Sequence, residues 1–173
     1  MRFGKSASAS PLSSNAQIRI HGQYVKKLDF VSPVAALWVR GSEEAANVDI
    51  EVDVASHVTP EKLSECAIEV RARATNSNGT IYEFNIIYGG LFDLGDVPAA
   101  IRSSVLNVSC PAIIFPGLRN IVGTMTHEAG VGALWLDPLD WTALYQQNAA
   151  SQSSAKAGDG LALSGSIQRS RMA

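Results

Sequence analysis

Histidines and neighbouring acids are the residues of this chain whose types and spacing could support chemistry. The three histidines, His21, His57 and His127, lie far apart in the sequence. His127-Glu128 begins like the His-Glu-x-x-His motif of zinc proteases, but Val131 stands where the second histidine ligand would be. The better interpretation is a polar pair on a helix surface, and we predict no metal site here.

Two groups of acids could be interpreted as metal or acid–base sites. Asp49, Glu51 and Asp53 alternate along one candidate strand, and Asp137 and Asp140 lie three residues apart. Acids that share one face of a strand usually form its solvated side. Acids at the start of a helix interact favourably with the helix dipole. Both groups are therefore predicted to be structural.

The nucleophile and phosphate-binding motifs of common enzymes do not occur in the sequence. There is no Gly-x-Ser-x-Gly, and Gly89-Gly90 is not followed by the Lys-Ser or Lys-Thr of a phosphate-binding loop. The sequence offers no assembled catalytic constellation and calls for no cofactor. It therefore favours a binding protein over an enzyme.

Composition narrows the class of protein further. The 173 residues fit one domain. Apolar residues make up 46% although both ends of the chain are polar, and such a surplus usually belongs to a subunit interface or an exposed groove. The net charge of −2 argues against nucleic acid as a partner. No uninterrupted apolar run approaches the roughly 20 residues that insertion into a membrane needs.

The N-terminus and the cysteines indicate a cytoplasmic protein. Arg2 and Lys5 are not followed by the apolar segment of a secretory signal. Cys66 and Cys110 lie in dissimilar settings, which favours reduced thiols over a disulfide.

Alternation of apolar and polar residues predicts four strands in the first half of the folded region. Two alternate clearly, from Val48 to Val54 and from Cys66 to Ala74. A third, from Ile81 to Tyr88, is apolar on both faces, which suits a central or an interfacial position. An earlier strand runs from Gln17 to about Val31. We expect these four strands to form an antiparallel meander.

Glycine and proline positions refine this prediction. Asn76-Ser77-Asn78-Gly79 is a tight hairpin signal, and Gly22 marks a bulge. Gly89-Gly90 is expected to end its strand where side-chain bulk does not fit. Pro111 and Pro116 bracket an apolar run that should not lie inside one regular helix.

The second half of the folded region is predicted to be helical. Residues 97–108 form one candidate helix. Apolar residues at helical spacing from Phe115 to Met125 form the next, which Gly130 should end. In the last helix, Asp137 is the expected N-cap and Pro138 the first helical residue.

Composition divides the chain into three parts. Residues 1–15, rich in Ser and Ala, are predicted to be a disordered N-terminal arm. Residues 16–148 form the folded α+β domain. Residues 149–173, rich in Ser, Ala, Gly and Gln, are predicted to be a disordered C-terminal tail.

Several separated motifs, spread over about three-quarters of the chain, resemble the SecB family of tetrameric bacterial export chaperones. In chain order they are Phe30-Val31-Ser32-Pro33, Gly89-Gly90-Leu91-Phe92, Cys110-Pro111 with Phe115-Pro116 and Arg119, and Leu136-Asp137-Pro138-Leu139-Asp140-Trp141-Thr142-Ala143-Leu144-Tyr145. The resemblance implies an α+β fold with a four-stranded antiparallel sheet and helices. It also implies that two subunits extend the sheet, and that two such dimers pack through helices into a homotetramer.

The function implied by the resemblance is an ATP-independent holdase. Family members keep unfolded precursor proteins translocation-competent in long apolar channels. The client-binding side chains expected on this basis are Val48, Ile50, Val52, Trp135, Trp141 and Tyr145. Subunit contacts are expected at Phe84, Ile86 and Tyr88. For the aromatic residues, with Trp38, a place in the ordinary core is the alternative.

Contact with the SecA motor is an open question in the sequence. Family members that deliver clients to SecA usually carry acids on the sheet surface. At the aligned positions this chain has Lys27, Val31 and Asn85, although Asp29 and Glu83 lie close by. The C-terminal tail is neutral to basic, whereas the family tail is usually acidic or carries basic and aromatic residues that dock on the motor. A SecB-like chaperone for another client, such as an antitoxin, therefore stays possible.

Two further classes of protein remain as alternatives. One is a carrier that encloses a small apolar ligand, and the other is an enzyme with unrecognised catalytic groups. A carrier should be monomeric or dimeric with a closed cavity. A holdase should be tetrameric, should have an open groove, and should delay the refolding of an unrelated protein without ATP.

Overall fold

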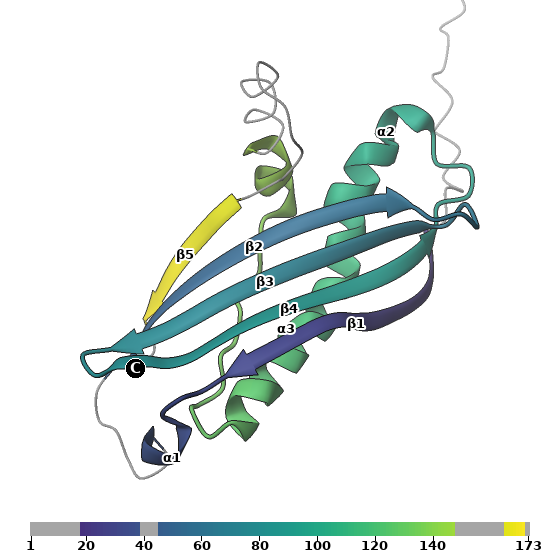
Figure 1. The fold of residues 1–173 in the computed structure, drawn as a ribbon. Helices are drawn as coiled ribbons and strands as arrows, with labels where there is room; N and C mark the ends of the chain where they lie inside the picture. The colour runs from purple at the N-terminus through teal and green to yellow at the C-terminus, as the bar shows by residue number, and fades with distance from the viewer. Residues whose placement is uncertain (1–17, 39–44, 148–164, 172–173) are drawn as a thin grey trace, which may run out of the picture.

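The computed structural model describes residues 18–38, 45–147 and 165–171. They form an antiparallel sheet with one long helix packed across one face (Figure 1). The strands are β1 (Arg19–Val31), β2 (Asn47–Val58), β3 (Ser64–Asn76), β4 (Gly79–Asp93) and β5 (Gly165–Arg171). The helical elements are α1 (Ala35–Trp38), α2 (Ala99–Ser104), the π-helical η1 (Val105–Ser109), α3 (Cys110–Glu128) and residues 141–147. The predicted α+β fold is confirmed.

The order of strands in the sheet is β1-β4-β3-β2-β5. β2, β3 and β4 follow one another as neighbours, but β1 pairs with β4 and not with β2. The predicted meander is therefore wrong. Alternation shows which residues share a face, but it does not show which edge a strand joins. β4, apolar on both faces, takes the inner position that this pattern suits.

β5 is a strand that the sequence analysis did not expect. It pairs antiparallel with β2, on the side of β2 that faces away from β3. Gly165–Arg171 lies within residues 149–173, for which composition predicted disorder. An edge strand presents unpaired N–H and C=O groups, and these can order a polar segment that has little tendency to fold by itself. The remainder of the expected tail, and residues 1–15, lie outside the described residues.

The hairpin and bulge signals of the sequence are confirmed. β3 ends at Asn76 and β4 begins at Gly79, which adopts a φ of 120°. The backbone N–H of Asn78 donates to Oδ1 of Asn76 at 3.0 Å, which stabilises the turn. The pairing of β1 with β4 shifts register between Ile20 and Gly22, where the bulge was predicted.

The two adjacent glycines of β4 lie inside the strand and do not end it, since β4 continues to Asp93. The prediction that side-chain bulk would not fit there is correct. A Cβ atom on Gly90 would lie 2.7 Å from Cγ2 of Ile114 in α3. A Cβ atom on Gly89, which points to the opposite face, would lie 3.2 Å from the ring of Tyr24. Gly90 thus lets α3 approach the sheet closely.

Pro111 and Pro116 both lie in α3, which corrects the prediction that they could not share one helix. The backbone N–H of Cys110 bonds to the carbonyl of Val105, five residues earlier, so a wide π turn precedes Pro111. That wide turn makes room for the ring and needs no N–H from Pro111. Pro116 and Ala112 are exposed, so water can satisfy the carbonyl that Pro116 leaves unpaired.

The two helices predicted before Gly130 are one continuous helical run, Ala99–Glu128. By length and composition this run could cross a membrane, although charged and polar residues interrupt its apolar residues. The core helix of a soluble protein passes the same test, and eight residues of α3 are buried in this structure. As predicted, the helix ends before Gly130, whose φ is 75°.

The last helix begins later than predicted. Oδ1 of Asp140 accepts a hydrogen bond from the backbone N–H of Ala143 at 2.9 Å, and the carbonyl of Asp140 accepts one from Leu144. Asp140 is therefore the N-cap, and the expected N-cap Asp137 lies before the helix, in a segment without regular secondary structure. Both acids have the right type, but only Asp140 lies where the apolar periodicity of Trp141 and Leu144 begins.

Candidate functional site

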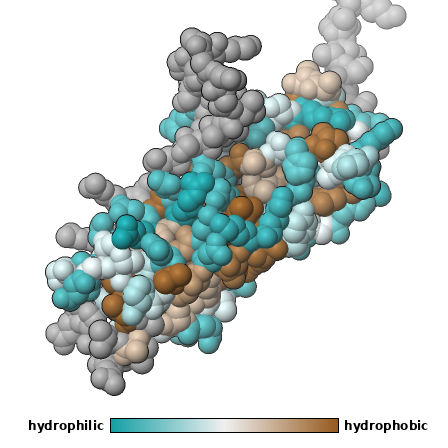
Figure 2. Space-filling model, viewed as in Figure 1, coloured by the Kyte–Doolittle hydropathy of each residue, from teal (hydrophilic) through white to brown (hydrophobic). Residues whose placement is uncertain are grey.

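The sheet has an inner face, against which α3 packs, and an outer face that is open to solvent. A hollow of about 460 Å³ lies on the outer face. Its charged lining consists of Asp29, Asp49, Glu51, Glu83, Arg71 and Arg73, which come from four neighbouring strands. Figure 2 shows this face, with hydrophilic residues gathered over the middle of the sheet and hydrophobic residues between them.

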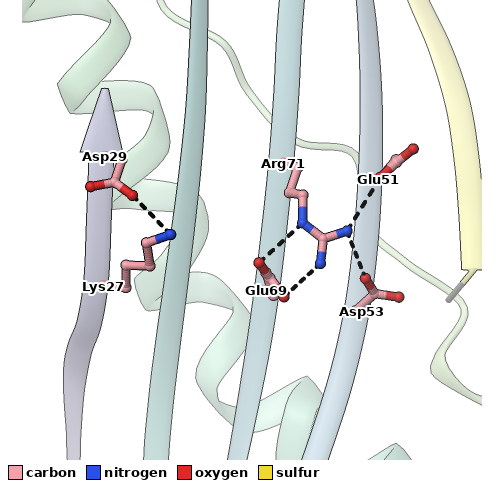
Figure 3. Close-up of polar contacts among 6 residues, drawn as sticks. All are labelled: Lys27, Asp29, Glu51, Asp53, Glu69 and Arg71. Carbon is pink, nitrogen blue, oxygen red and sulfur yellow. Dashed lines mark hydrogen bonds and ion pairs between the residues drawn. The ribbon is translucent and has the colours of Figure 1, made fainter. Parts of the chain in front are cut away.

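Arg71 is the centre of an ion-pair network beside this hollow (Figure 3). Its guanidinium donates to Glu69 at 2.8 Å and lies 3.3 Å from Glu51 and 3.2 Å from Asp53. The hydrogen bond to Glu69 is the main cause that raises the pKa of Arg71. Asp49 and Glu51 are exposed, as predicted for the solvated side of a strand, and Asp53 is half-buried beside Arg71. In the described part of the chain, no group of His, Cys, Asp or Glu could hold a metal ion.

The two residues considered for SecA contact lie on the same face. Asp29 in β1 pairs with Lys27 at 2.9 Å, and Glu83 in β4 lies 3.9 Å from Arg73. Both carboxylates line the hollow. Each therefore has one basic neighbour, and both remain accessible from solvent.

A second polar cluster, which the sequence analysis missed, surrounds the buried carboxylate of Glu65 in β3. Lys26 from β1 forms an ion pair with it, and Nε2 of His57 from β2 lies 3.4 Å away. Burial and the charge of Glu65 raise the pKa of Tyr24. Tyr24 and Lys26 both pass over Gly89, whose missing side chain lets them reach across β4. The cluster thus connects β1 to β3.

The residues expected to bind clients are distributed between core and surface. Val48 and Val52 are buried in the core, and Trp141 is buried with its ring edge-to-face against Phe115 at 5.4 Å. In this structure these three side chains are not accessible to a client. Ile50 and Tyr145 are half-buried, and Trp135 is 55% exposed. Trp38 packs half-buried against the core.

Two of these aromatic residues show the course of the chain after α3. The ring of Trp135 lies against Gly123, where a Cβ atom would be 2.6 Å away, and the guanidinium of Arg119 lies 5.8 Å from the ring centroid. Oη of Tyr145 lies 3.2 Å from Oγ of Ser103 in α2. Residues 135–145 therefore run back along the helix, from near its C-terminal end to its first turns.

The residues expected at subunit contacts belong to the chain's own core. Phe84, Ile86 and Tyr88 are all buried, and Ile86 is fully so. Tyr88 and Gly90 point to the inner face, since they approach Gly117 and Ile114 of α3. The face of β4 assigned to a neighbouring subunit is thus the face that packs on its own helix. Apolar residues on both sides of the strand did not show which side that would be.

Exposed apolar side chains occur elsewhere in the described residues. Nine large ones are exposed, and five of them are on β1: Ile20, Tyr24, Val25, Leu28 and Val31. The remaining four are Val58, Ile101, Ile113 and Trp135. The apolar residues of β1 do not alternate regularly along the sequence, which agrees with the finding that not all of them reach the core.

Comparison with known proteins assigns the chain to a class and a family. A family model described as preprotein translocase subunit SecB matches residues 12–152. The match places the protein among the protein-export chaperones, whose members are not known as enzymes. The chain belongs to the SecB family.

Individual relatives agree with this assignment. The protein-export protein SecB of Maricaulis maris is 32% identical over 142 residues, which cover 82% of this chain and 83% of that protein. The SecB of Bartonella quintana is 30% identical over 130 residues, covering 75% and 82%. Among solved structures, a SecB-like chaperone of Mycobacterium tuberculosis in complex with an antitoxin peptide has a TM-score of 0.59 at 16% identity. It covers 72% of this chain and 92% of that chain, and it supports the shared fold.

Proposed function

We propose that this protein is an ATP-independent holdase of the cytoplasm that binds unfolded precursor proteins and keeps them translocation-competent. The observation that carries the proposal is the set of large apolar side chains exposed on a chain of the SecB family. Burial of one such side chain contributes at most about 1.5–3 kcal/mol, and ordering the client offsets much of that. Several contacts must therefore form together, which only an unfolded chain can do.

The proposed assembly is a homotetramer. Ile20, Val25 and Leu28 of β1 are paired with inner-facing positions of β4, yet all three are exposed. No described strand pairs with the outer edge of β1. Pairing of two copies at this edge would extend the sheet and cover those side chains. The exposed Ile101 and Ile113 support packing of two such dimers through their helices.

The proposed client surface lies near β2, far from the β1 edge of the sheet. Ile50, Val54 and Val58 share the inner face of β2 and become more accessible along the strand, from half-buried at Ile50 to 61% exposed at Val58. Trp135 and Tyr145 add aromatic surface from the segment that runs back along the helix. Of the residues expected from the sequence, Ile50, Trp135 and Tyr145 are kept in this proposal, and Val48, Val52 and Trp141 are not.

The test is the refolding of an unrelated denatured enzyme without nucleotide. An excess of the protein should delay recovery of enzyme activity. Val58→Asp and Trp135→Ala should each shorten the delay several-fold, whereas Gln146→Asp, at an exposed polar position, should leave it unchanged. Refolding at the uninhibited rate in the presence of excess protein would contradict the proposal. A parallel assay with an export precursor and an antitoxin as clients separates the two kinds of SecB-like role.

Delivery of clients to the SecA motor is the second step that we propose. Its support is the accessible outer hollow, where Asp29 and Glu83 lie among four acids and two arginines. A basic surface of the motor could compete for these carboxylates. The double variant Asp29→Lys and Glu83→Lys should lose binding to purified SecA in a titration and still delay refolding. Unchanged SecA affinity would restrict the function to holding.

A further inference from the structure

We propose that the outer edge of β2 is a strand-addition site for extended polypeptide, and that β5 occupies this edge as a displaceable cover. The inference rests on the proposed holding of unfolded chains and specifies a place and a regulation for it. β5 comes from the same chain, beyond the last helix, and lies beside β2 at the edge of the sheet (Figure 1).

The pairing of β5 with β2 is antiparallel and covers only half of the edge. Its register runs from Asn47 opposite Arg171 to Val52 opposite Gly165, with a shift between Asp49 and Glu51. No described strand pairs with residues 55–58 on this edge of β2. The backbone N–H and C=O groups of that uncovered part can accept a further strand, as exposed sheet edges do.

The uncovered half of β2 gives an incoming segment a place to begin. Residues 55–58 are exposed, and Val58 offers an apolar contact beside backbone groups that no other described strand pairs on this edge. A client strand that pairs there can extend toward Asn47 by replacing β5 one residue at a time. The apolar residues proposed for client binding lie on this same strand, so backbone pairing and side-chain contacts can form together.

The composition of β5 suits a cover that leaves easily. Its sequence, Gly-Ser-Ile-Gln-Arg-Ser-Arg, contains one large apolar residue, so little apolar burial can hold it. The register places Arg169 opposite Asp49, on the face of β2 that carries its acids. Opposite charges on a sheet edge favour this pairing, and salt weakens it. Attachment to the same chain compensates for this weak binding, because a tethered strand has an effective concentration on the order of mM.

The first experiment uses a synthetic, fluorescent peptide of residues 163–173. The chain that lacks residues 164–173 should bind this peptide in an anisotropy titration, and the full chain should bind it at least about tenfold more weakly. A control peptide with Arg169→Glu and Arg171→Glu should bind several-fold more weakly than the natural one. Equal binding to both chains, or binding to neither, would overturn the edge site.

The second experiment locks the cover in the full chain. Directly opposite Cα atoms of an antiparallel pair are about 4.5–5.5 Å apart, within the range that a disulfide spans. The double variant Asp49→Cys and Arg169→Cys can therefore be oxidised, while Cys66 and Cys110 stay buried. The oxidised form should bind a denatured client at least about tenfold more weakly than its own reduced form. Equal client affinity in the two forms would overturn the role of β5 as a cover.

These results separate the inference from the proposed function. If the tail peptide binds the shortened chain but neither chain delays refolding, the edge site stands and holding is wrong. If both chains delay refolding equally and the peptide binds neither, holding stands and the edge site is wrong. Weaker holding by the shortened chain would also overturn the inference, because it would make β5 a required part of the client site.

Discussion

Gly90 shows how one residue determines the distance between helix and sheet. Its side of β4 faces α3, where a Cβ atom would meet Ile114 at 2.7 Å and the ring of Phe92 at 2.9 Å. Both neighbours are fully buried and have little room to move. The close approach of α3 therefore depends on the absence of a side chain at this position.

Gly90→Ala should lower the free energy of unfolding by about 1–3 kcal/mol, as overpacking of a dense core does. Urea denaturation followed by circular dichroism measures this change. Gly22→Ala is the matched control, because no atom lies within 4 Å of its added Cβ and the site is exposed. The control should change stability by less than about 1 kcal/mol. Equal effects of the two substitutions would contradict this account of the interface.

The buried thiols give the protein a dependence on alkaline pH. Burial raises the pKa of Cys66 from 9.0 to about 12, and that of Cys110 from 9.0 to about 11. Between these values the unfolded chain loses thiol protons that the folded chain keeps, so the unfolded state binds fewer protons. Stability should therefore be undiminished below pH 9 and fall as pH rises, by up to about 1.4 kcal/mol per pH unit for each thiol.

Urea unfolding at pH 8 and pH 10 tests this dependence on the thiols. The Cys66→Ala variant should be less stable at both pH values, since it leaves a small cavity. It should nevertheless lose less stability between them than the natural chain does. A loss of the same size in both proteins would assign the dependence to other groups, such as the buried Tyr82.

At the scale of elements, capping and local helix geometry determine where the second half of the chain changes direction. The π turn of η1 lets a helix continue into Pro111, so α2, η1 and α3 act as one support for the sheet. Asp140 starts the last helix after the buried residues Leu134 and Leu136, which lie in a segment without regular secondary structure. The position of this cap thus determines how many residues run back along α3 before the last helix begins.

Asp140→Ala should lower the free energy of unfolding by about 1 kcal/mol, because it removes the side-chain acceptor for the N–H of Ala143. Asp137→Ala provides the control: this acid is also exposed, lies three residues earlier and should change stability by less than about 0.5 kcal/mol. Thermal denaturation of the two variants shows which of the two acids caps the last helix. A larger loss in Asp137→Ala would place the start of the helix where the sequence alone suggested it.

In the whole molecule, the β1 edge of the sheet is open along its length, since no described strand pairs with it. β1 carries five of the nine exposed large apolar side chains of the described residues. An exposed apolar edge strand can pair with another chain. If the other chain is an identical copy, the two β1 strands satisfy each other's backbone groups about a two-fold axis. A monomer with this edge uncovered should therefore be the less stable form.

Multi-angle light scattering should give a mass of four times 18.4 kDa for the natural chain. Leu28→Asp, at a position that is 46% exposed in the single subunit, should reduce this mass and leave the circular dichroism spectrum unchanged. Gln146→Asp should keep the full mass. A charge at Ile86 would test the stability of the subunit and not its assembly. This residue is fully buried, so an unpaired charge there should unfold the subunit. A natural chain of 18.4 kDa would contradict the tetramer.

The local features of this protein follow from short stretches of its sequence. The alternation of Val48 to Val54, the hairpin at Asn76 to Gly79 and the lack of space at Gly89-Gly90 depend on neighbours in the chain, and each was predicted. The motifs also predicted the family. These features follow from backbone sterics and strand periodicity, which act over a few residues.

Which side chains and strand edges remain exposed depends on contacts between segments that are distant in the chain. Ile86 and Leu28 are both apolar in the sequence, yet Ile86 is fully buried and Leu28 is exposed. The order of strands explains the difference, because it places β4 inside the sheet and β1 at its edge. The same order gives β2 a second open edge, where Gly165–Arg171 becomes a strand. Burial and edge pairing depend on contacts with elements that lie far away in the chain. The alternation of residues within one strand does not identify those elements.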